Sequence, residues 1–529
     1  MTANVRIDSA TAIDFQTKPL SGSRHASVAA SPLLIPLSAR GSADVSAGLA
    51  APELSSQDDA LPLYRQVYQR FIQAISQGSL TPGQRVPSIR ALAGELQVSR
   101  NTVELAYELL IGEGYLEARG QAGTVVSPRL AEVRMQQPRP ADAPAPRPAS
   151  LSLFDSASDW QPLPYQLGLP ALDLFPRKLW ASLNTRQLRL QNRFLSYPQP
   201  AGYGPLREAI AAYLHLSRGL DCSPQQVFIT AGYRGALNLI GRTLLRPLDQ
   251  VWIEDPCFPP SRHLMAEMGA ELVPVPVDRD GMQVAVAKER APHARFALVT
   301  PAHQSPLGVS LSLVRRLELL AWAEHNNAFI IEDDYDSEYR YDGRPQPALA
   351  SLGANDNVLY VGSFSKVLSP ALRLAYLVVP KPLLTRFNAA CHTWHDGCPL
   401  LNQGVVVDFM QEGHFIRHLR KMRSAYAQRR ELVIASLRQA FGERMSFDVP
   451  ACGLHLLARL DRSEDDIALA QRAKRERFGI AALSARALEA DCGKGLLFGF
   501  ANVATPEQAA QQARNLRLCL EGRSLPSGG

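Results

Sequence analysis

A proline-rich stretch at residues 128–150 interrupts this 529-residue chain. Proline fixes the backbone angle φ and has no amide hydrogen to donate, so such a stretch belongs neither to a helix interior nor to the centre of a sheet. Segments of this kind are extended and semi-rigid, at about 3.1 Å per residue. The sequence therefore predicts a linker that holds two separately folded parts of the chain apart. The prolines are Pro128, Pro138, Pro140, Pro144, Pro146 and Pro148.

The residues on either side of this linker differ in pattern. Residues 1–59 are rich in Ser, Ala and Gly and have no sustained apolar period, which predicts a disordered arm. Residues 60–127 have the compact apolar pattern of a small domain. Residues 151–522 alternate short apolar runs with helical stretches, which is typical of βαβ units around a largely parallel sheet. We therefore expect an α/β protein with a small N-terminal domain.

Composition excludes several classes of protein. The 56 basic and 50 acidic residues leave a net charge of +6, too weak over this length to indicate nucleic-acid binding by itself. The seven cysteines include no C-x-x-C pair, which indicates a reducing compartment rather than a disulfide framework. No apolar run reaches the roughly 18 residues of a membrane span, and no secretory signal precedes the first domain. We expect a cytoplasmic protein without a membrane segment.

The domain at 60–127 has the pattern of a helix-turn-helix followed by a β-ribbon. After a first helix at about 64–77, Ser88 and Ser99 are the predicted N-caps of two short helices. The second of these carries an apolar stripe at helical spacing: Val103, Ala106, Tyr107 and Leu110. Its exposed first turn, with which a helix-turn-helix reads base edges, holds Arg100, Asn101 and Thr102. The ribbon at 114–127 is a predicted wing with Arg119 at its tip.

The charge of this small domain leaves its partner open on pattern alone. It has six arginines against five glutamates, a net charge of +1, whereas DNA-binding domains usually carry a clear basic footprint. The alternative interpretations are a winged helix used for protein contact and a small helical domain of another kind.

In residues 151–522, predicted buried strands end in polar or glycine residues, which is where open α/β sheets hold their ligands. These strands fall at 227–230, 251–254, 296–300, 328–331 and 358–361. The first runs into a glycine turn and a helix, whose N-terminus can hold a phosphate. The fourth runs into four acids between Glu332 and Asp336, which are costly beside a buried strand unless a cationic group meets them. The turns after the first three strands contain Tyr233 and Arg234, Phe258, and Ser305.

Lysine is scarce in this chain, and one of its eight lysines has a distinctive setting. Lys366 alone follows a buried strand, with Ser363 and Ser365 beside it and Arg373 seven residues later. This set suits Schiff-base chemistry on a phosphorylated aldehyde, because the lysine supplies the amine while hydroxyls and arginine hold the phosphate. Asp333 would pair with a pyridine nitrogen and make the ring an electron sink. A surface lysine beside a serine-rich loop explains the motif alone but not the ordered set.

The ordered set resembles the pyridoxal-phosphate-dependent aminotransferases of fold type I. The small domain resembles the GntR-type winged helix-turn-helix through PLYRQVYQRF, PSIRALA and VSRNTVELAYELLIGEGYLEARGQAGTVV. Four further segments are similar to the MocR/GabR regulators, which join these two domains: TPAHQSPLG, IIEDDYDSEYRYDGRPQPAL, VLYVGSFSKVLSPALRLAYLV and EGHFIRHLRKMRSAYAQRR. The resemblance covers roughly residues 61–520. It implies a mainly parallel sheet in a large subdomain and a smaller C-terminal α+β subdomain.

The resemblance also implies a role for each matched residue. Lys366 forms the Schiff base to pyridoxal phosphate, Asp333 pairs with the pyridine nitrogen, and Tyr335 contacts the ring hydroxyl. The implied phosphate ligands are Ser363, Ser365, Arg373, Tyr233 and Arg234. Phe258 stacks on the ring and Ser305 lies beside its hydroxyl, while Tyr197 matches a tyrosine that reaches the neighbouring subunit's phosphate and so implies a homodimer. The implied contacts to operator DNA are Arg90, Ser99, Arg100, Asn101, Thr102 and Arg119.

Five positions depart from the aminotransferase pattern. Tyr233 and Arg234 replace small or amide residues in the phosphate turn. Ser305 stands where the family has an asparagine, and Phe258 replaces the commoner tyrosine. Leu497 falls where many of these enzymes place the arginine that clamps a substrate carboxylate. Losing that clamp costs about 2 to 3 kcal/mol of binding in a reactive pose. Full transaminase turnover is therefore disfavoured, although aldimine chemistry or a half-reaction is compatible with the sequence.

Two clusters fall outside this pattern. One cluster consists of potential zinc ligands: Cys391, His392, His395 and Cys398. Because the adjacent Cys391 and His392 cannot easily face one tetrahedral ion, we predict no metal. A basic helix begins at His414 and contains Arg417, His418, Arg420 and Arg423. We interpret it as a solvated or dimer-facing surface, with a second DNA contact as the alternative.

The sequence thus predicts a MocR/GabR-type transcriptional regulator. Its winged domain binds operator DNA, and its aminotransferase-like domain binds pyridoxal phosphate and senses a small effector, either an amino compound or pyridoxal phosphate itself. The alternatives are a working aminotransferase with an accessory DNA-binding domain, and a DNA-binding dimer that has lost the cofactor. The presence of Lys366, Asp333 and Arg373 disfavours the last.

Overall fold

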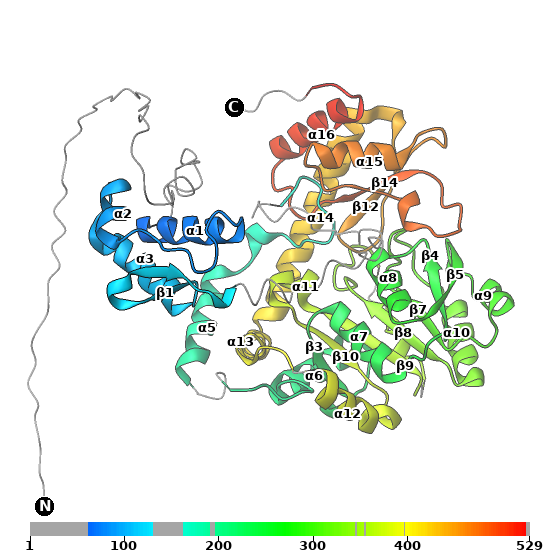
Figure 1. The fold of residues 1–529 in the computed structure, drawn as a ribbon. Helices are drawn as coiled ribbons and strands as arrows, with labels where there is room; N and C mark the ends of the chain where they lie inside the picture. The colour runs from blue at the N-terminus through cyan, green and yellow to red at the C-terminus, as the bar shows by residue number, and fades with distance from the viewer. Residues whose placement is uncertain are drawn as a thin grey trace, which may run out of the picture. The chain divides into compact units, whose positions relative to one another are not determined.

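The computed structural model describes residues 62–130, 162–190, 196–343, 346–353, 356–395 and 397–524. The chain divides into two compact units, Met1–Leu153 and Phe154–Gly529 (Figure 1). The predicted arm at 1–59 lies outside the described residues, and so does the predicted linker apart from residues 128–130. No helix within the described ranges is long and apolar enough to cross a membrane.

The first unit has three helices and a two-stranded ribbon. Its elements are α1 (Leu63–Ser76), α2 (Ile89–Glu95), α3 (Arg100–Gly112), β1 (Leu116–Ala118) and β2 (Thr124–Val126). Both predicted N-caps form: the hydroxyl of Ser88 accepts from the N–H of Ala91 at 3.2 Å, and that of Ser99 from the N–H of Thr102 at 3.1 Å. The α3 stripe predicted from the sequence is buried against Phe71 of α1 and Leu92 of α2. Packing of this stripe fixes the first turn of α3 at the surface.

The second unit is built on an eight-stranded, mainly parallel sheet. Its order is β3-β10-β9-β8-β7-β4-β5-β6, in which β9, β8, β7, β4 and β5 run parallel while β10 and β6 are antiparallel to their neighbours. The strands are β3 (Val227–Thr230), β4 (Gln250–Asp255), β5 (Glu271–Asp278), β6 (Gly281–Met282), β7 (Phe296–Val299), β8 (Phe329–Asp334), β9 (Val358–Ser363) and β10 (Ala375–Val378).

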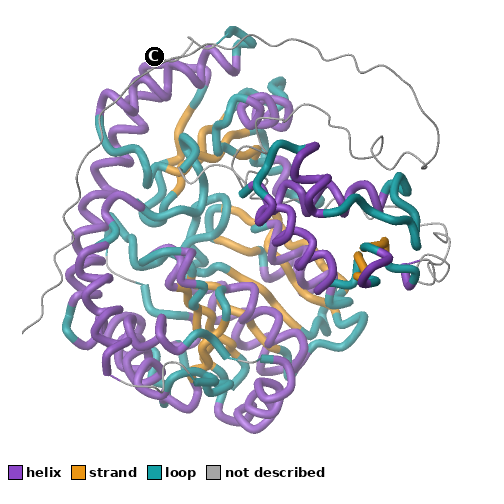
Figure 2. Tube along the Cα trace, turned by 60° about the vertical axis from the view of Figure 1, so that its left-hand side comes forward, coloured by secondary structure: helices purple, strands orange, loops and turns teal. Residues whose placement is uncertain are grey.

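Helices cover both faces of this sheet (Figure 2). Alternate residues of one strand point to different cores; in β9, for example, Leu359 joins the core under α7 and Tyr360 joins the core on the other face. Burial on both faces explains why the strands read as continuous apolar runs. The helices are α5 (Arg177–Leu190), α6 (Gly204–Arg218), α7 (Tyr233–Leu244), α8 (Pro259–Glu267), α9 (Val284–Arg290), α10 (Leu313–Asn326), α11 (Phe364–Val367), α12 (Leu384–Trp394), α13 (Leu400–Gln411) and α14 (His414–Phe441).

The C-terminal part forms the smaller α+β subdomain. Its antiparallel sheet has the order β11-β12-β14-β13, and the long helix α14 and the last helices pack around it. The elements are β11 (Ser446–Asp448), β12 (His455–Arg459), α15 (Asp466–Arg475), β13 (Ala481–Ala482), β14 (Gly495–Gly499) and α16 (Pro506–Leu520). Loops between these strands return to the carboxyl ends of the large parallel sheet, where the predicted cofactor residues lie.

Candidate cofactor site and candidate nucleic-acid interface

Lys366 lies in the short helix α11, directly after β9. The hydroxyl of Ser363 caps this helix by accepting from the N–H of Ser365 at 3.1 Å. The ammonium Nζ of Lys366 donates to the carbonyl of Gly168 at 2.5 Å. Burial lowers the pKa of Lys366, against the attraction of Asp336 and Asp333. A depressed pKa raises the share of the neutral amine, which is the nucleophilic form.

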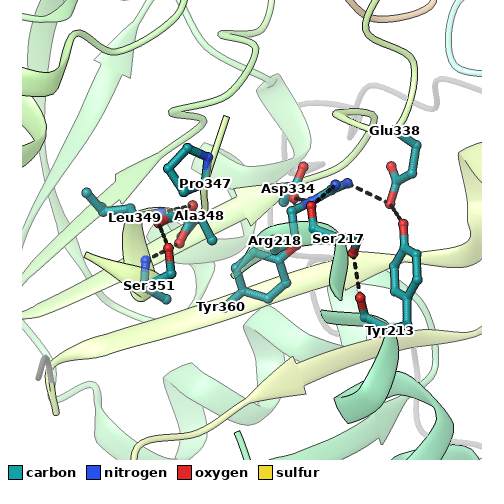
Figure 3. Close-up of polar contacts among 12 residues, drawn as sticks. Tyr213, Ser217, Arg218, Asp334, Glu338, Pro347, Ala348, Leu349, Ser351 and Tyr360 are labelled. Carbon is teal, nitrogen blue, oxygen red and sulfur yellow. Dashed lines mark hydrogen bonds and ion pairs between the residues drawn. The ribbon is translucent and has the colours of Figure 1, made fainter. Parts of the chain in front are cut away.

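A buried ionic network holds the carboxyl end of β8 (Figure 3). The guanidinium of Arg218 contacts Asp334 at 2.8 Å and Glu338 at 3.0 Å. The hydroxyl of Tyr360 donates to Asp334 at 2.5 Å, and that of Tyr213 to Glu338 at 3.2 Å. The attraction of Arg218 holds the pKa of Asp334 below its usual value despite burial. Arg218 is therefore the cationic group that the acids at the end of β8 were expected to need.

Asp333 is left without such a partner. Burial raises its pKa to about 8, Asp334 and Asp336 add to the rise, and a hydrogen bond from Tyr233 opposes it. No lysine, arginine or histidine among the described residues forms an ion pair with Asp333. A buried carboxyl in this state favours a cationic N–H partner, and a protonated pyridine nitrogen supplies one. The residues present therefore fit pyridoxal phosphate at this point.

The hydroxyl of Tyr335 belongs to a second buried chain. It lies 3.0 Å from Nδ1 of His303, which lies 2.9 Å from a carboxylate oxygen of Asp336. Because a carboxylate only accepts, the shared hydrogen is on Nδ1, and the hydroxyl hydrogen of Tyr335 is free for another acceptor. Ser305 also hydrogen-bonds to Tyr335. Sequence reasoning included Tyr335 and Ser305 but missed His303 and Asp336, although both lie within the quoted motifs.

The predicted phosphate turn differs in detail from expectation. The side chain of Tyr233 lies against Asp333 and 2.9 Å from the hydroxyl of Ser261, and that of Arg234 is exposed. The turn itself offers the N-terminus of α7, where Gly232 has a φ of +75°. A Cβ at position 232 would make only van der Waals contact with the guanidinium of Arg373, at 3.4 Å, so it is the positive φ that favours glycine here. Arg373 also donates to the carbonyl of Ala231 at 3.1 Å.

The other positions matched to the aminotransferases, Phe258, Tyr197 and Leu497, range from exposed to fully buried. Phe258 is half-buried at the start of α8, with its ring centroid 6.5 Å from that of Tyr233. Tyr197 is 96% exposed. Leu497 is 1% exposed in an apolar cluster with Leu457 and Leu483, against which Leu167 and Leu307 pack. An apolar cluster therefore occupies the position of the aminotransferase arginine.

The two clusters outside the main pattern are tied to the interior. Cys391 and Cys398 lie in different apolar cores, and Nε2 of His395 contacts the carbonyl of Ile229 at 2.8 Å. In α14, His418 is buried with Nε2 3.0 Å from the carbonyl of Val367. Arg423 donates to the carbonyl of Glu338 at 2.9 Å. The interpretation of this basic helix as a solvated surface is therefore wrong for His418, which is buried, whereas Arg417, Arg420 and Arg423 are exposed.

The predicted DNA-contacting residues fall into two groups. Arg90 on α2 and Arg100 and Asn101 in the first turn of α3 are exposed. Ser99 and Thr102 instead hydrogen-bond to each other at 2.7 Å between their hydroxyl oxygens, as part of the α3 cap. In the wing, Arg119 lies 3.7 Å from Glu117.

The sequence did not indicate one further basic residue beside the wing, Arg85. Arg85 is exposed and forms an isolated bridge with Val125 of the wing. A Cβ at Gly123 would lie 2.8 Å from Nε of Arg85, so this glycine, with a φ of +89°, leaves room for the guanidinium. No local sequence signal pairs Arg85 with the wing, because the contact joins segments about 40 residues apart.

Two family models match this chain. The gntR family of bacterial regulatory proteins matches residues 63–126, and aminotransferase class I and II matches residues 172–497. The probable rhizopine catabolism regulatory protein MocR of Rhizobium meliloti is 34% identical over 476 residues, which cover 88% of this chain and 96% of MocR. This chain belongs to the MocR type of GntR-family transcriptional regulators.

Other relatives of this MocR-type chain agree. The pyridoxine biosynthesis transcriptional regulator PdxR of Corynebacterium glutamicum is 31% identical and covers 82% of this chain and 91% of its own. Among solved structures, the α-aminoadipate aminotransferase LysN of Thermus thermophilus, complexed with N-(5'-phosphopyridoxyl)-L-leucine, is 27% identical with a TM-score of 0.62. The match covers 68% of this chain and 92% of LysN. The comparisons confirm the predicted family, fold class, regulatory function and type of cofactor.

His455, a half-buried histidine on β12 beside His303, predicts an acid-sensitive stability. Burial, reinforced by His303, lowers the pKa of His455 to about 4. Since the unfolded chain binds the proton more tightly, with a pKa of about 6.5, stability is full above that pH and falls as the pH drops toward 4. At pH 5 the loss amounts to about 2 kcal/mol.

Urea unfolding of the cofactor-free protein at pH 7.5 and pH 5 measures this loss. We expect His455→Gln to lose about 2 kcal/mol less than the wild type between the two pH values, and His392→Gln, at an exposed position, to behave as wild type. Equal acid sensitivity in wild type and His455→Gln would contradict the prediction, because it would show that folding does not lower the pKa of His455.

Proposed function

We propose that this regulator holds pyridoxal phosphate through Lys366 and uses the loaded site to sense a small amino compound, whose binding changes the affinity of the winged domain for operator DNA. One observation carries the proposal. An amine with a lowered pKa, Lys366, interacts at the carboxyl ends of the sheet with Asp333, a buried carboxyl that has no ion pair within the described ranges, in a chain that also carries a DNA-binding module.

In this proposal each side chain has one task. Lys366 supplies the amine that bonds to the cofactor, and Asp333 accepts from its protonated ring nitrogen. Tyr335, aligned by His303, donates to the ring hydroxyl. Arg373 and the N-terminus of α7 hold the phosphate. The bound cofactor supplies a carbonyl carbon that exchanges one amine for another and a ring that stabilises negative charge.

The effect on DNA follows from linkage. A ligand shifts the DNA-binding equilibrium only if it binds two states of the protein with different affinity, and the operator must then change ligand affinity by the same factor. Couplings of this kind typically amount to about 1 to 3 kcal/mol, or 5- to 150-fold.

We further propose that the regulator is a homodimer. The almost full exposure of Tyr197 supports this, since an aromatic ring in water gains free energy when a partner covers it. Operators read by helix-turn-helix dimers have two half-sites, so we expect a two-fold sequence repeat in the selected DNA. Analytical ultracentrifugation of wild type and Tyr197→Ala measures the dimer directly.

The coupling is tested on the full-length protein with a duplex selected from a random-sequence pool. Operator affinity is measured at fixed salt with the cofactor-free protein, the loaded protein, and the loaded protein with each of a panel of amines. We expect a change of at least 5-fold for the cofactor or for one amine, and no such change in Lys366→Ala. Identical affinities in all states would contradict the sensor.

The remaining alternative is an active aminotransferase. The apolar surroundings of Leu497 argue against it, because the usual carboxylate clamp is absent there. Steady conversion of an amino acid with a keto acid would support the enzyme. A single stoichiometric change of the cofactor spectrum without turnover would support the sensor.

A further inference from the structure

The side chain of Tyr233 serves another part of the candidate site than the phosphate turn. Tyr233 is the first residue of α7, directly after Gly232. Its hydroxyl hydrogen-bonds to the carboxyl of Asp333 on β8 and lies 2.9 Å from the hydroxyl of Ser261 on α8. Its ring packs against the apolar core under α7. Tyr233 therefore joins α7, α8 and β8 at the end of the site that Asp333 marks.

The hydrogen bonds of Tyr233 run in one direction. An ionised carboxyl only accepts, so the hydroxyl of Tyr233 donates its single hydrogen to Asp333. The buried hydroxyl of Ser261 must then donate to the oxygen of Tyr233. Burial, reinforced by Asp333, raises the pKa of Tyr233, so this hydroxyl keeps its proton. Ser261, Tyr233 and Asp333 thus form a chain of hydrogen bonds whose members polarise one another.

Each of the three acids that surround Asp333 has a partner of its own. All three raise the pKa of Asp333, and the hydrogen bond from Tyr233 opposes that rise. The pairs are Asp334 with Arg218 at 2.8 Å, Asp336 with His303 at 2.9 Å, and Glu254 with the hydroxyl of Thr300 at 2.5 Å. Tyr233 provides for Asp333 what these partners provide for its neighbours.

The strength of the bond from Tyr233 depends on the charge of Asp333. A hydrogen bond to an ionised carboxyl is roughly twice as strong as one to a neutral carboxyl. In the cofactor-free protein Asp333 is mostly neutral at pH 7, because its pKa is raised to about 8. Asp333 is a carboxylate when a protonated ring nitrogen lies beside it. Tyr233 therefore contributes most when that nitrogen is present.

We infer that Tyr233, supported by Ser261, is a positioning residue that makes the site selective for a cofactor with a protonated ring nitrogen. Its hydroxyl occupies one acceptor position of the Asp333 carboxylate and leaves the others for the ring N–H. A shorter side chain at the start of α7 would not reach Asp333, which accounts for a tyrosine where aminotransferases carry small or amide residues. This inference rests on the proposed cofactor site and deepens it by assigning a residue that specifies the ligand.

The test uses the full-length protein and two probes at pH 7. One is pyridoxal phosphate and the other is its deaza analogue, in which a C–H group replaces the ring nitrogen. Dissociation constants are taken from the absorption band that each probe gives when bonded to the protein. We expect Tyr233→Phe to weaken binding of pyridoxal phosphate by about 10-fold and to leave binding of the analogue within about 2-fold. Beside the analogue Asp333 stays neutral, as it is in the cofactor-free protein, so little is lost.

Three further variants frame this result. Ser261→Ala, which removes the donor to Tyr233, should weaken binding of pyridoxal phosphate in the same selective way but by less. Asp333→Asn should abolish the preference for pyridoxal phosphate over the analogue. Tyr115→Phe, which removes a tyrosine hydroxyl from the winged domain, should change neither dissociation constant.

The two probes separate a positioning role from a structural one. Equal losses for both probes in Tyr233→Phe, or no loss for pyridoxal phosphate, would overturn the inference alone. If Tyr233→Phe does not fold, Ser261→Ala decides by the same criterion. A wild type that forms a band with neither probe would overturn the cofactor site as well.

Discussion

Lys366→Ala will abolish the absorption band that pyridoxal phosphate gives when bonded to the protein, whereas wild type will show it after loading. The expected effect is complete, because the band requires a covalent bond to an amine and, among the lysines that the structure describes, Lys366 alone lies with Asp333 at the end of the parallel strands. Its Nζ donates to the carbonyl of Gly168, and burial already favours the neutral amine.

The matched control for this variant is Lys381→Ala, at an exposed position outside the site. It should keep the full band, while Lys366→Arg, which keeps the charge but not the nucleophile, should lose it. Dialysis followed by spectroscopy separates bonded from loosely held cofactor. Retention of the band in Lys366→Ala would show that another amine holds the cofactor, and would remove the central residue of the site.

Arg100→Ala will weaken binding to the selected operator by about 1 to 3 kcal/mol, roughly 5- to 150-fold. Arg100 is the first residue of α3, is exposed, and has no ion pair in the described part of the chain. Ser99 and the buried stripe of α3 fix the direction in which this turn faces. Fluorescence anisotropy at fixed salt measures the loss, because phosphate contacts make every DNA affinity salt-dependent.

Two comparisons decide what Arg100 does. Arg65→Ala, an exposed arginine on α1, should change operator affinity much less. If Arg100 reads a base, its loss should weaken operator binding more than binding to unrelated DNA; if it contacts only phosphate, both should fall together. Unchanged operator affinity would show that the recognition turn lies elsewhere, with Arg90 and Arg85 the next residues to vary.

The sequence by itself determined the elements whose signals are local. Continuous apolar runs at 227–230, 251–254 and 358–361 form β3, β4 and β9, because strands buried on both faces need apolar side chains at successive positions. Ser88 and Ser99 marked helix starts, because a hydroxyl satisfies an N–H that the first helical turn leaves free. The position of Lys366 directly after β9 also follows from a local signal, the apolar run that precedes it.

Only the tertiary structure decided which charges are paired. The acids at the end of β8 look alike in sequence, yet Arg218 neutralises Asp334 from over 100 residues away, while Asp333 has no ion pair in the part of the chain that the structure describes. The same holds for Tyr233, whose hydroxyl faces Asp333. Burial and the distance between charges set these properties, and both arise from contacts between segments far apart in the chain.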